Sequence, residues 1–252
     1  MTSVSNAAVG AFLAGNAAAK ARHGMNEAIA RLSTGVRSMY GGDAAGASVA
    51  HSLRAEGRSA MAAARNVEDG ISFLQAGESA LLEIAALNTR LRELAVQDLN
   101  AAFLDANQEA AITAEENAIL AAGNAIDAAD LNGTALLTAA IAFTNTLDGG
   151  TTSYGAAADL TLASGVTNVD TQMGRISKAL GSMAAGIAAL KGHQGNLYGL
   201  AANSEAAAAR IQDTDFARSS ANLAKFTILN QSAMAMVAQA NQANSAVLAV
   251  LQ

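Results

Sequence analysis

The sequence predicts a mainly α-helical protein, an elongated antiparallel helical bundle or coiled coil with a small β-hairpin and paired N- and C-termini. The first observation is composition: 52% of the 252 residues are hydrophobic, only 4% are aromatic, and the chain contains no proline. Half of the apolar residues are alanine, the best helix former, which buries little area per residue. The second is an apolar repeat with steps of three and four residues. The third is a long uncharged stretch at each end of the chain.

The first predicted helix begins in residues 1–19, which carry no charged side chain. An apolar stripe at helical spacing follows, formed by Met25, Ile29, Leu32 and Val36. Glycines then cluster around one acid, which indicates a hinge between helices. The residues of this hinge are Gly41, Gly42, Asp43 and Gly46.

Two further helices are predicted before a short β element. The second helix has large apolar residues at helical spacing: Leu74, Leu81, Ile84, Leu87, Leu91 and Leu94. A third, shorter helix carries Ile112, Ile119, Ala122 and Ile126, and ends at the sequence DLNG. From about residue 136 to 169 the chain is rich in threonine with partial alternation, and Asp148-Gly149-Gly150 suits the turn of a hairpin.

The most regular segment runs from Met173 to Ile211. Alternating steps of three and four place one seam at residues 173, 176, 180, 183, 187, 190, 194, 197, 201, 204, 208 and 211, of which only Gln194 and Ser204 are polar. This pattern predicts a long coiled-coil helix. The seam breaks at the sequence QDTDFA, where Asp213 or Asp215 is expected to cap a last helix.

The last helix is expected to use a second seam. The same spacing selects Phe226, Leu229, Ala233, Met236, Ala240, Ala243, Val247 and Val250. No charged residue occurs from Phe226 to Gln252. Two paired terminal helices cannot bury every side of themselves, and alanine seams offset little of the cost of ordering the backbone. Many copies packed side by side would supply that burial at little desolvation cost, so the termini are interpreted as an assembly surface.

Composition and spacing disfavour several other classes of protein. A net charge of −6 without a basic block argues against nucleic acid or an anionic membrane as partner. The absence of cysteine excludes disulfides and thiolate chemistry, and asparagine and glutamine interrupt the uncharged C-terminal stretch too often for a membrane span. The three histidines are widely separated, and Asp213-Thr214-Asp215 is explained by capping. We therefore expect no metal, no cofactor and no enzymatic activity.

Several motifs carry a resemblance to a known family. The sequence RLSTGVR followed by GDAAGASVAHSL is similar to the N-terminal signature of bacterial flagellin, and RNVEDGISFLQAGESAL and RLRELAVQ resemble its next helix. RIQDTDFARSSANLAKFTILNQSAMAMVAQANQ resembles its C-terminal signature. The similarity runs from Arg31 to Leu251 in the family's order.

This resemblance implies a secreted subunit that polymerises with copies of itself into the extracellular flagellar filament for motility. It also implies an export chaperone, a type III export apparatus, a filament cap and junction proteins as partners. Residues 1–41 and 213–252 would form an inner-tube domain. Residues 42–212 would form a helical rod with the hairpin at about 136–169, and the variable outer domains would be missing.

The resemblance also assigns roles to residues. Those expected in the inner tube are Met25, Ile29, Leu32, Val36, Phe226, Leu229, Met236, Val247 and Val250. Arg90, Leu91, Arg92, Glu93 and Leu94 match positions that meet an innate immune receptor in related flagellins. The segment that usually completes that surface, ITAEENAIL here, departs from the family pattern, which leaves receptor binding open.

Two alternatives remain at this point. A hook–filament junction protein of the same superfamily would form one short ring, although the sequence MVAQANQ favours flagellin. An amphipathic lipid-binding helical protein, from a different class, would need a basic polar face, which the terminal segments lack.

Overall fold

The computed structural model describes residues 2–37, 42–137, 140–144, 146, 149–155 and 160–251, without the side chains of 2–8, 247, 248, 250 and 251. The elements are α1 (Thr2–Thr34), α2 (Ala44–Asp98), the 3₁₀ helix η1 (Ala101–Phe103), α3 (Ala106–Asp127), β1 (Asp130–Leu131), β2 (Thr134–Ala135), β3 (Ile141–Thr144), β4 (Thr151–Tyr154), α4 (Val166–Gln212) and α5 (Phe216–Leu251). The predicted mainly α fold with a small hairpin is confirmed.

The chain forms two compact units, which are described separately. We call Met1–Arg54 with Ser204–Gln252 the terminal unit, and Ala55–Asn203 the central unit.

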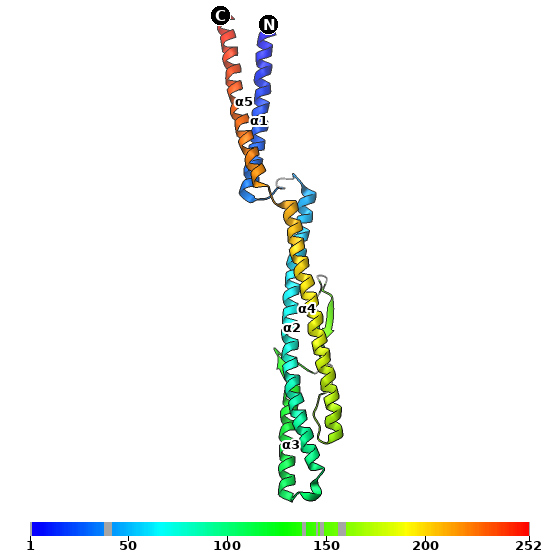
Figure 1. Cartoon of the computed structure of the whole chain (residues 1–252). Coiled ribbons are helices and arrows are strands. Elements are labelled where there is room, and N and C mark those ends of the chain that lie inside the picture. Colours follow the sequence, from blue (N-terminus) through cyan, green and yellow to red (C-terminus); the bar gives the residue numbers. More distant parts are fainter. Residues whose placement is uncertain are drawn as a thin grey trace. The chain divides into compact units, whose positions relative to one another are not determined.

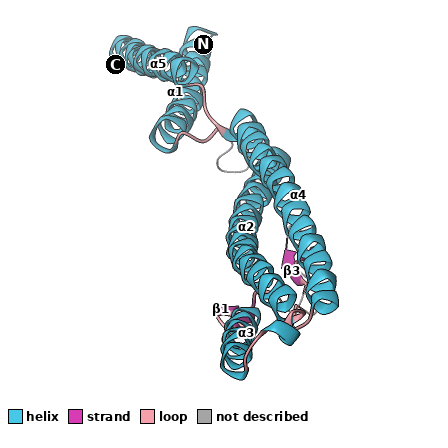
Figure 2. Ribbon diagram, turned by 60° about the horizontal axis from the view of Figure 1, so that its bottom comes forward, coloured by secondary structure: helices cyan, strands magenta, loops and turns pink. Residues whose placement is uncertain are grey.

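In the central unit α2 and α4 run antiparallel with α3 beside them (Figures 1 and 2). The core is built from the predicted seams, because every predicted α4 seam residue from Met173 to Ala201 is buried or half-buried, as are the last three, which lie in the terminal unit. Leu74, Leu81, Ile84, Leu91 and Leu94 of α2 are also fully buried. The predicted seams of both long helices are therefore confirmed.

The predicted hairpin is formed by β3 and β4, which pair from Ile141↔Tyr154 to Thr144↔Thr151. Asp148 of the expected turn lies outside the described residues, while Gly149 has a φ of 79°. The Phe143 ring packs against Phe73 of α2, with ring centroids 6.4 Å apart. The hairpin thus covers part of the core between the long helices.

A second, smaller hairpin occupies the sequence DLNGTA, where only the end of a helix was expected. Its strands β1 and β2 are antiparallel and pair Leu131 with Thr134. Asn132 and Gly133 form the turn with φ values of 56° and 74°. Positive φ at both central residues is the geometry of a type I′ turn, which Asn-Gly favours. The Asn-Gly dipeptide was the signal for this hairpin.

The Phe143 ring lies against α2 at Gly70, where the helix has no side chain. A Cβ atom at Gly70 would lie 2.8 Å from Cδ1 of the Phe143 ring, whereas one at Gly181 of α4 would have no neighbour within 4 Å. We expect Gly70→Ala to lower the free energy of unfolding by about 1–3 kcal/mol through overpacking. The matched change Gly181→Ala should raise it by about 0.5–1 kcal/mol, because alanine is the better helix former. Denaturant unfolding followed by circular dichroism measures both, and equal effects would contradict the packing argument.

In the terminal unit α1 and α5 lie side by side and antiparallel, so that both chain ends lie at the same end of the pair (Figure 1). The contact is made of small residues: Ala18, Ala21 and Ala28 of α1 and Ala233 of α5 are buried. The predicted pairing of the termini is confirmed.

Candidate assembly surface on the terminal helices

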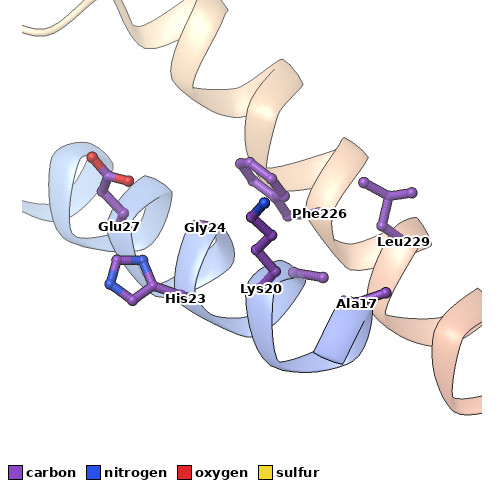
Figure 3. A pocket seen from close by; sticks show the side chains of 8 residues that line it. Ala17, Lys20, His23, Gly24, Glu27, Phe226 and Leu229 are labelled. Atoms are coloured by element: carbon purple, nitrogen blue, oxygen red, sulfur yellow. The ribbon is translucent and has the colours of Figure 1, made fainter. Parts of the chain in front are cut away.

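The largest side chain in the contact between α1 and α5 is Phe226. Its ring points from α5 toward Gly24 of α1, and a Cβ atom at Gly24 would lie 2.6 Å from the ring. Figure 3 shows the open groove at this position, whose volume is about 440 Å³. Its lining residues are Ala17, Lys20, Ala21, His23, Gly24, Glu27, Phe226 and Leu229. Only glycine fits beneath Phe226, so this contact fixes one point of the helix pair.

The remaining α5 contacts differ from the seam selected by spacing. Phe226, Ala233 and Ala240 face α1 as expected, and Asn230 and Val237 lie half-buried beside them. Leu229 and Met236 are instead exposed, by 46% and 59%. A helix of this composition offers several stripes at the same spacing, and small residues allow the closest approach to α1.

The helix pair departs from an ordinary soluble coiled coil, because amide groups lie in its contact while large apolar side chains lie outside it. The Oδ1 atoms of Asn230 and Asn244 are buried and have no hydrogen-bond partner in the part of the chain that the structure describes. The large apolar side chains point outward: Val9, Phe12, Leu13 and Ile29 of α1, and Ile228, Leu229, Met234 and Met236 of α5 are exposed. We call these eight residues the outer apolar face. Eight large apolar side chains exposed on one helix pair indicate an interaction surface.

Charge is confined to one end of the helix pair. The first charged residue of α1 is Lys20, and the last one of α5 is Lys225. Most of the outer apolar face, from Val9 to Leu13 and from Ile228 to Met236, lies in the uncharged portions. Covering Val9 to Leu13 would require almost no desolvation of ions, which is the costly step in burying helix surface. Beside α5, by contrast, Lys20 lies in the same groove as Leu229, and Arg22 contacts Met234.

The other predicted assembly residues are placed as follows. Met25, Leu32 and Val36 are half-buried, and Ile29 is 47% exposed. The side chains of Val247 and Val250 lie outside the described residues. The role of all these residues in assembly stays a prediction.

The predicted hinge contains an acid held by its neighbours. Gly41 lies outside the described residues, and Gly42 and Asp43 form a turn before α2. The Asp43 carboxylate accepts from the Gly46 amide at 2.8 Å and from Arg37 at 2.7 Å. The Gly46 hydrogen bond, followed by the one from Arg37, lowers the pKa of Asp43. A lowered pKa favours the folded state above the ordinary pKa of a carboxyl, and this contribution is lost as the pH falls through the folded-state value.

The break between α4 and α5 lies where it was predicted. Asp215 caps α5 and accepts from the Arg218 amide at 3.1 Å. Asp213 has a different role, because it forms an isolated antiparallel bridge with Val36. The sequence left the choice between these two acids open, and the structure selects Asp215 as the cap.

The five residues compared with a receptor patch fall on two sides of α2. Leu91 and Leu94 are buried in the core. Arg90 is exposed and pairs with Glu93 at 2.8 Å and Glu115 at 2.7 Å, and these hydrogen bonds raise its pKa. Only the exposed Arg90, Arg92 and Glu93 are available to a partner, and binding of a receptor stays a prediction.

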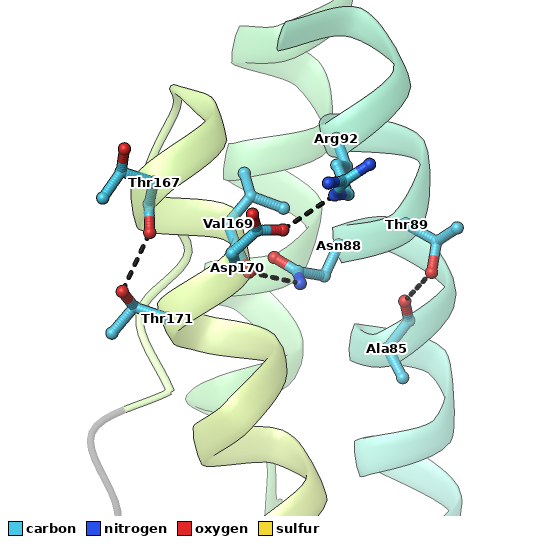
Figure 4. A network of polar contacts seen from close by, with 8 residues as sticks. All are labelled: Ala85, Asn88, Thr89, Arg92, Thr167, Val169, Asp170 and Thr171. Carbon is cyan, nitrogen blue, oxygen red and sulfur yellow. Dashed lines mark hydrogen bonds and ion pairs between the residues drawn. The ribbon is translucent and has the colours of Figure 1, made fainter. Parts of the chain in front are cut away.

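Arg92 belongs to a polar network that joins α2 to the start of α4 (Figure 4). It donates to Asp170 at 2.7 Å, which raises the pKa of Arg92. Asn88, one turn earlier, is fully buried and donates from Nδ2 to the Val169 carbonyl at 3.0 Å. Sequence reasoning missed Asn88, although a lone asparagine between Ile84 and Leu91 at seam spacing was a readable signal.

The described part of the chain shows neither a metal-binding cluster nor a membrane-spanning helix. No group of three or more His, Cys, Asp or Glu residues there is arranged to hold a metal ion. None of the helices, over the residues the structure describes, has the length and hydropathy required to cross a bilayer.

Comparison with known families identifies the class of protein. Residues 6–142 match the bacterial flagellin N-terminal helical region, and residues 166–251 match the bacterial flagellin C-terminal helical region. The chain therefore belongs to the bacterial flagellin family. It is a short form, since only residues 155–165 separate β4 from α4.

Individual relatives have similar lengths. The chain is 30% identical to a flagellin of Halalkalibacterium halodurans, with 90% of this chain and 91% of the relative covered. It is 31% identical to flagellar filament core protein flaB2 of Brachyspira hyodysenteriae, with 90% and 92% covered. It is 29% identical to flagellin FlaB1 of Treponema pallidum, with 90% and 92% covered.

Proposed function

We propose that this chain is a structural subunit that polymerises through its terminal helices into the bacterial flagellar filament and so serves motility. The family and the filament core proteins among its relatives support a filament subunit. The observation that carries the role of the terminal helices is the outer apolar face on helices whose segments 1–19 and 226–252 carry no charged side chain.

In this proposal the partner of each copy is another copy of the same chain. The terminal unit, which contains the predicted segments 1–41 and 213–252, forms the inner tube, and the central unit forms the rod outside it. Burial of one leucine or methionine side chain is worth about 1.5–3 kcal/mol, and the gain repeats in every subunit. In this proposal the chain is a structural subunit and not an enzyme.

The family membership also supports finer proposals. The subunit is secreted through a type III export apparatus with the help of a chaperone, and it polymerises beneath a cap, next to junction proteins. Recognition by an innate immune receptor would use the exposed Arg90, Arg92 and Glu93.

A seeded polymerisation assay tests the proposed function. Purified chain is mixed with short filament fragments at neutral pH and followed by negative-stain electron microscopy, beside a chain truncated after Lys225. We expect long filaments from the full chain and none from the truncated one, because the truncation removes the outer apolar face of α5. Circular dichroism should show that the truncated chain keeps the helices of its central unit.

Two results of this assay would contradict the proposal. Filaments from the truncated chain would exclude the role of α5. Short rings from the full chain would favour the junction protein instead.

A further inference from the structure

Two connecting segments of the terminal unit are joined by backbone hydrogen bonds. The segment 35–37 follows α1, and the segment 211–214 runs from the end of α4 toward α5. The Arg37 amide donates to the Gln212 carbonyl at 2.7 Å, and the Thr214 amide donates to the Gly35 carbonyl at 2.9 Å. Between these bonds, Val36 and Asp213 form an antiparallel bridge of the non-hydrogen-bonded type, in which the side chains are closest. Gly35 has a φ of 71°, which favours glycine at this position.

The Arg37 side chain adds a second connection. Its Nε donates to the Ile211 carbonyl at 3.0 Å, in the last turn of α4, where carbonyl groups lack partners within the helix. Its Nη2 pairs with Asp43 at 2.7 Å, and Asp43 in turn accepts from the Gly46 amide at the start of α2. A planar guanidinium suits this double role because it presents several donors in fixed directions.

Further contacts hold the second segment in place. Arg54 lies 3.5 Å from both Asp213 and Glu205. The hydroxyl groups of Thr214 and Ser219 are 3.2 Å apart, and both residues are buried. The first turn of α5 is therefore tied to the residues that pair with segment 35–37.

The contact between α1 and α5 by itself specifies their register weakly. Ala233 is buried in it, and Ala240, seven residues further, is half-buried on the same side. A slide of α5 by seven residues would place one alanine where another lies now, so packing of small residues discriminates little between the two registers. Of the contacts described above, only the packing of Phe226 on Gly24 distinguishes the observed register from the displaced one.

We propose that segments 35–37 and 211–214 form a latch that fixes the register of α1 on α5, with Arg37 as its positioning residue. The inference rests on the proposed function, because the register decides which members of the outer apolar face lie next to one another on the surface offered to the next copy. When the two segments are paired, the end of α1 and the start of α5 are held next to each other. The helices then pair in the register that puts Phe226 over Gly24.

The closed latch is tested with disulfides, because the chain contains no cysteine. In a non-hydrogen-bonded antiparallel pair the Cα atoms are about 4.5 Å apart, which is within the range that a disulfide spans. The double variant Val36→Cys/Asp213→Cys is therefore expected to cross-link within one chain under mild oxidation. The control pair Ser33→Cys/Asp213→Cys should cross-link much more slowly. Equal rates, measured on non-reducing gels of free chain and of filaments, would overturn the latch.

The role of Arg37 is tested by the register of the helices. Thr227 Oγ1 lies 3.8 Å from Met25 Sδ, so Met25→Cys/Thr227→Cys reports the observed register. The pair Met25→Cys/Met234→Cys reports the register displaced by seven residues, in which residue 234 takes the place of Thr227. Adding Arg37→Ala should lower the ratio of the first cross-link to the second about fivefold, the loss expected for a hydrogen bond from a charged group that is partly exposed.

Arg31→Ala is the matched control for charge. Arg31 pairs only with Glu27 of its own helix among the ion pairs that the structure describes, so its loss should leave the cross-link ratio unchanged. An unchanged ratio with Arg37→Ala, in filaments that form normally, would overturn the latch and leave the proposed function intact. A ratio that depends on Arg37 in a chain that never forms filaments would contradict the proposed function alone.

Discussion

Met236→Lys is expected to abolish filament formation while the helix content and the unfolding of the central unit stay unchanged. Met236 is 59% exposed on α5, so a lysine there is hydrated in the free subunit and leaves the contact with α1 intact. When copies pack together, the same ammonium group would have to leave water without a partner, because residues 226–252 carry no charge. The effective cost is several kcal/mol per ion, and it recurs in every subunit.

The measurement for Met236→Lys is seeded polymerisation followed by electron microscopy and by sedimentation of the polymer. Met236→Leu is the matched control, since it keeps an apolar side chain of similar size at the same position, and it should polymerise like the unaltered chain. Normal filaments from Met236→Lys would remove this side of α5 from the assembly surface.

The predictability of the two coiled-coil seams differs for a physical reason. The α4 seam contains large residues such as Ile176, Met183 and Leu190, and burying them decides which face of the helix turns inward. In α5 the observed inner stripe has Asn230 and Val237 where the predicted one has Leu229 and Met236, so burial of the largest side chains does not decide which face turns toward α1. Spacing alone then selected Leu229 and Met236, which the structure leaves exposed.

Local signals predicted the ends of helices better than contacts between distant residues. The acids after α4 and the glycines after α1 marked both interruptions, because caps and turns depend on neighbours in sequence. The hydrogen bond from Arg37 to the Ile211 carbonyl joins residues 174 positions apart, and no periodicity in the sequence encodes it. The connection between the two interruptions therefore had to come from the structure.

Asn88 is the polar group whose replacement should affect the central unit most. It is fully buried, and it donates to the Val169 carbonyl while its own Oδ1 has no partner among the described residues (Figure 4). Arg92, one turn further along α2, is already paired with Asp170. A carboxylate at position 88 would thus have no donor for Val169 and would face that carbonyl with a negative charge.

Asn88→Asp is expected to lower the free energy of unfolding by about 2–4 kcal/mol at neutral pH, because a buried charge loses its hydration without gaining a partner. Burial raises the folded-state pKa of the introduced carboxyl above its ordinary value of about 3.9. Below a pH of about 3.9 the carboxyl is protonated in both the folded and the unfolded state, and the neutral acid can donate to Val169, so the loss of stability is small. The loss grows as the pH rises from there toward the folded-state pKa. Denaturant unfolding between acidic and neutral pH measures this. The neighbouring exposed Thr89→Asp should change stability by less than about 0.5 kcal/mol, and an equal, pH-independent loss in both variants would contradict the buried-network explanation.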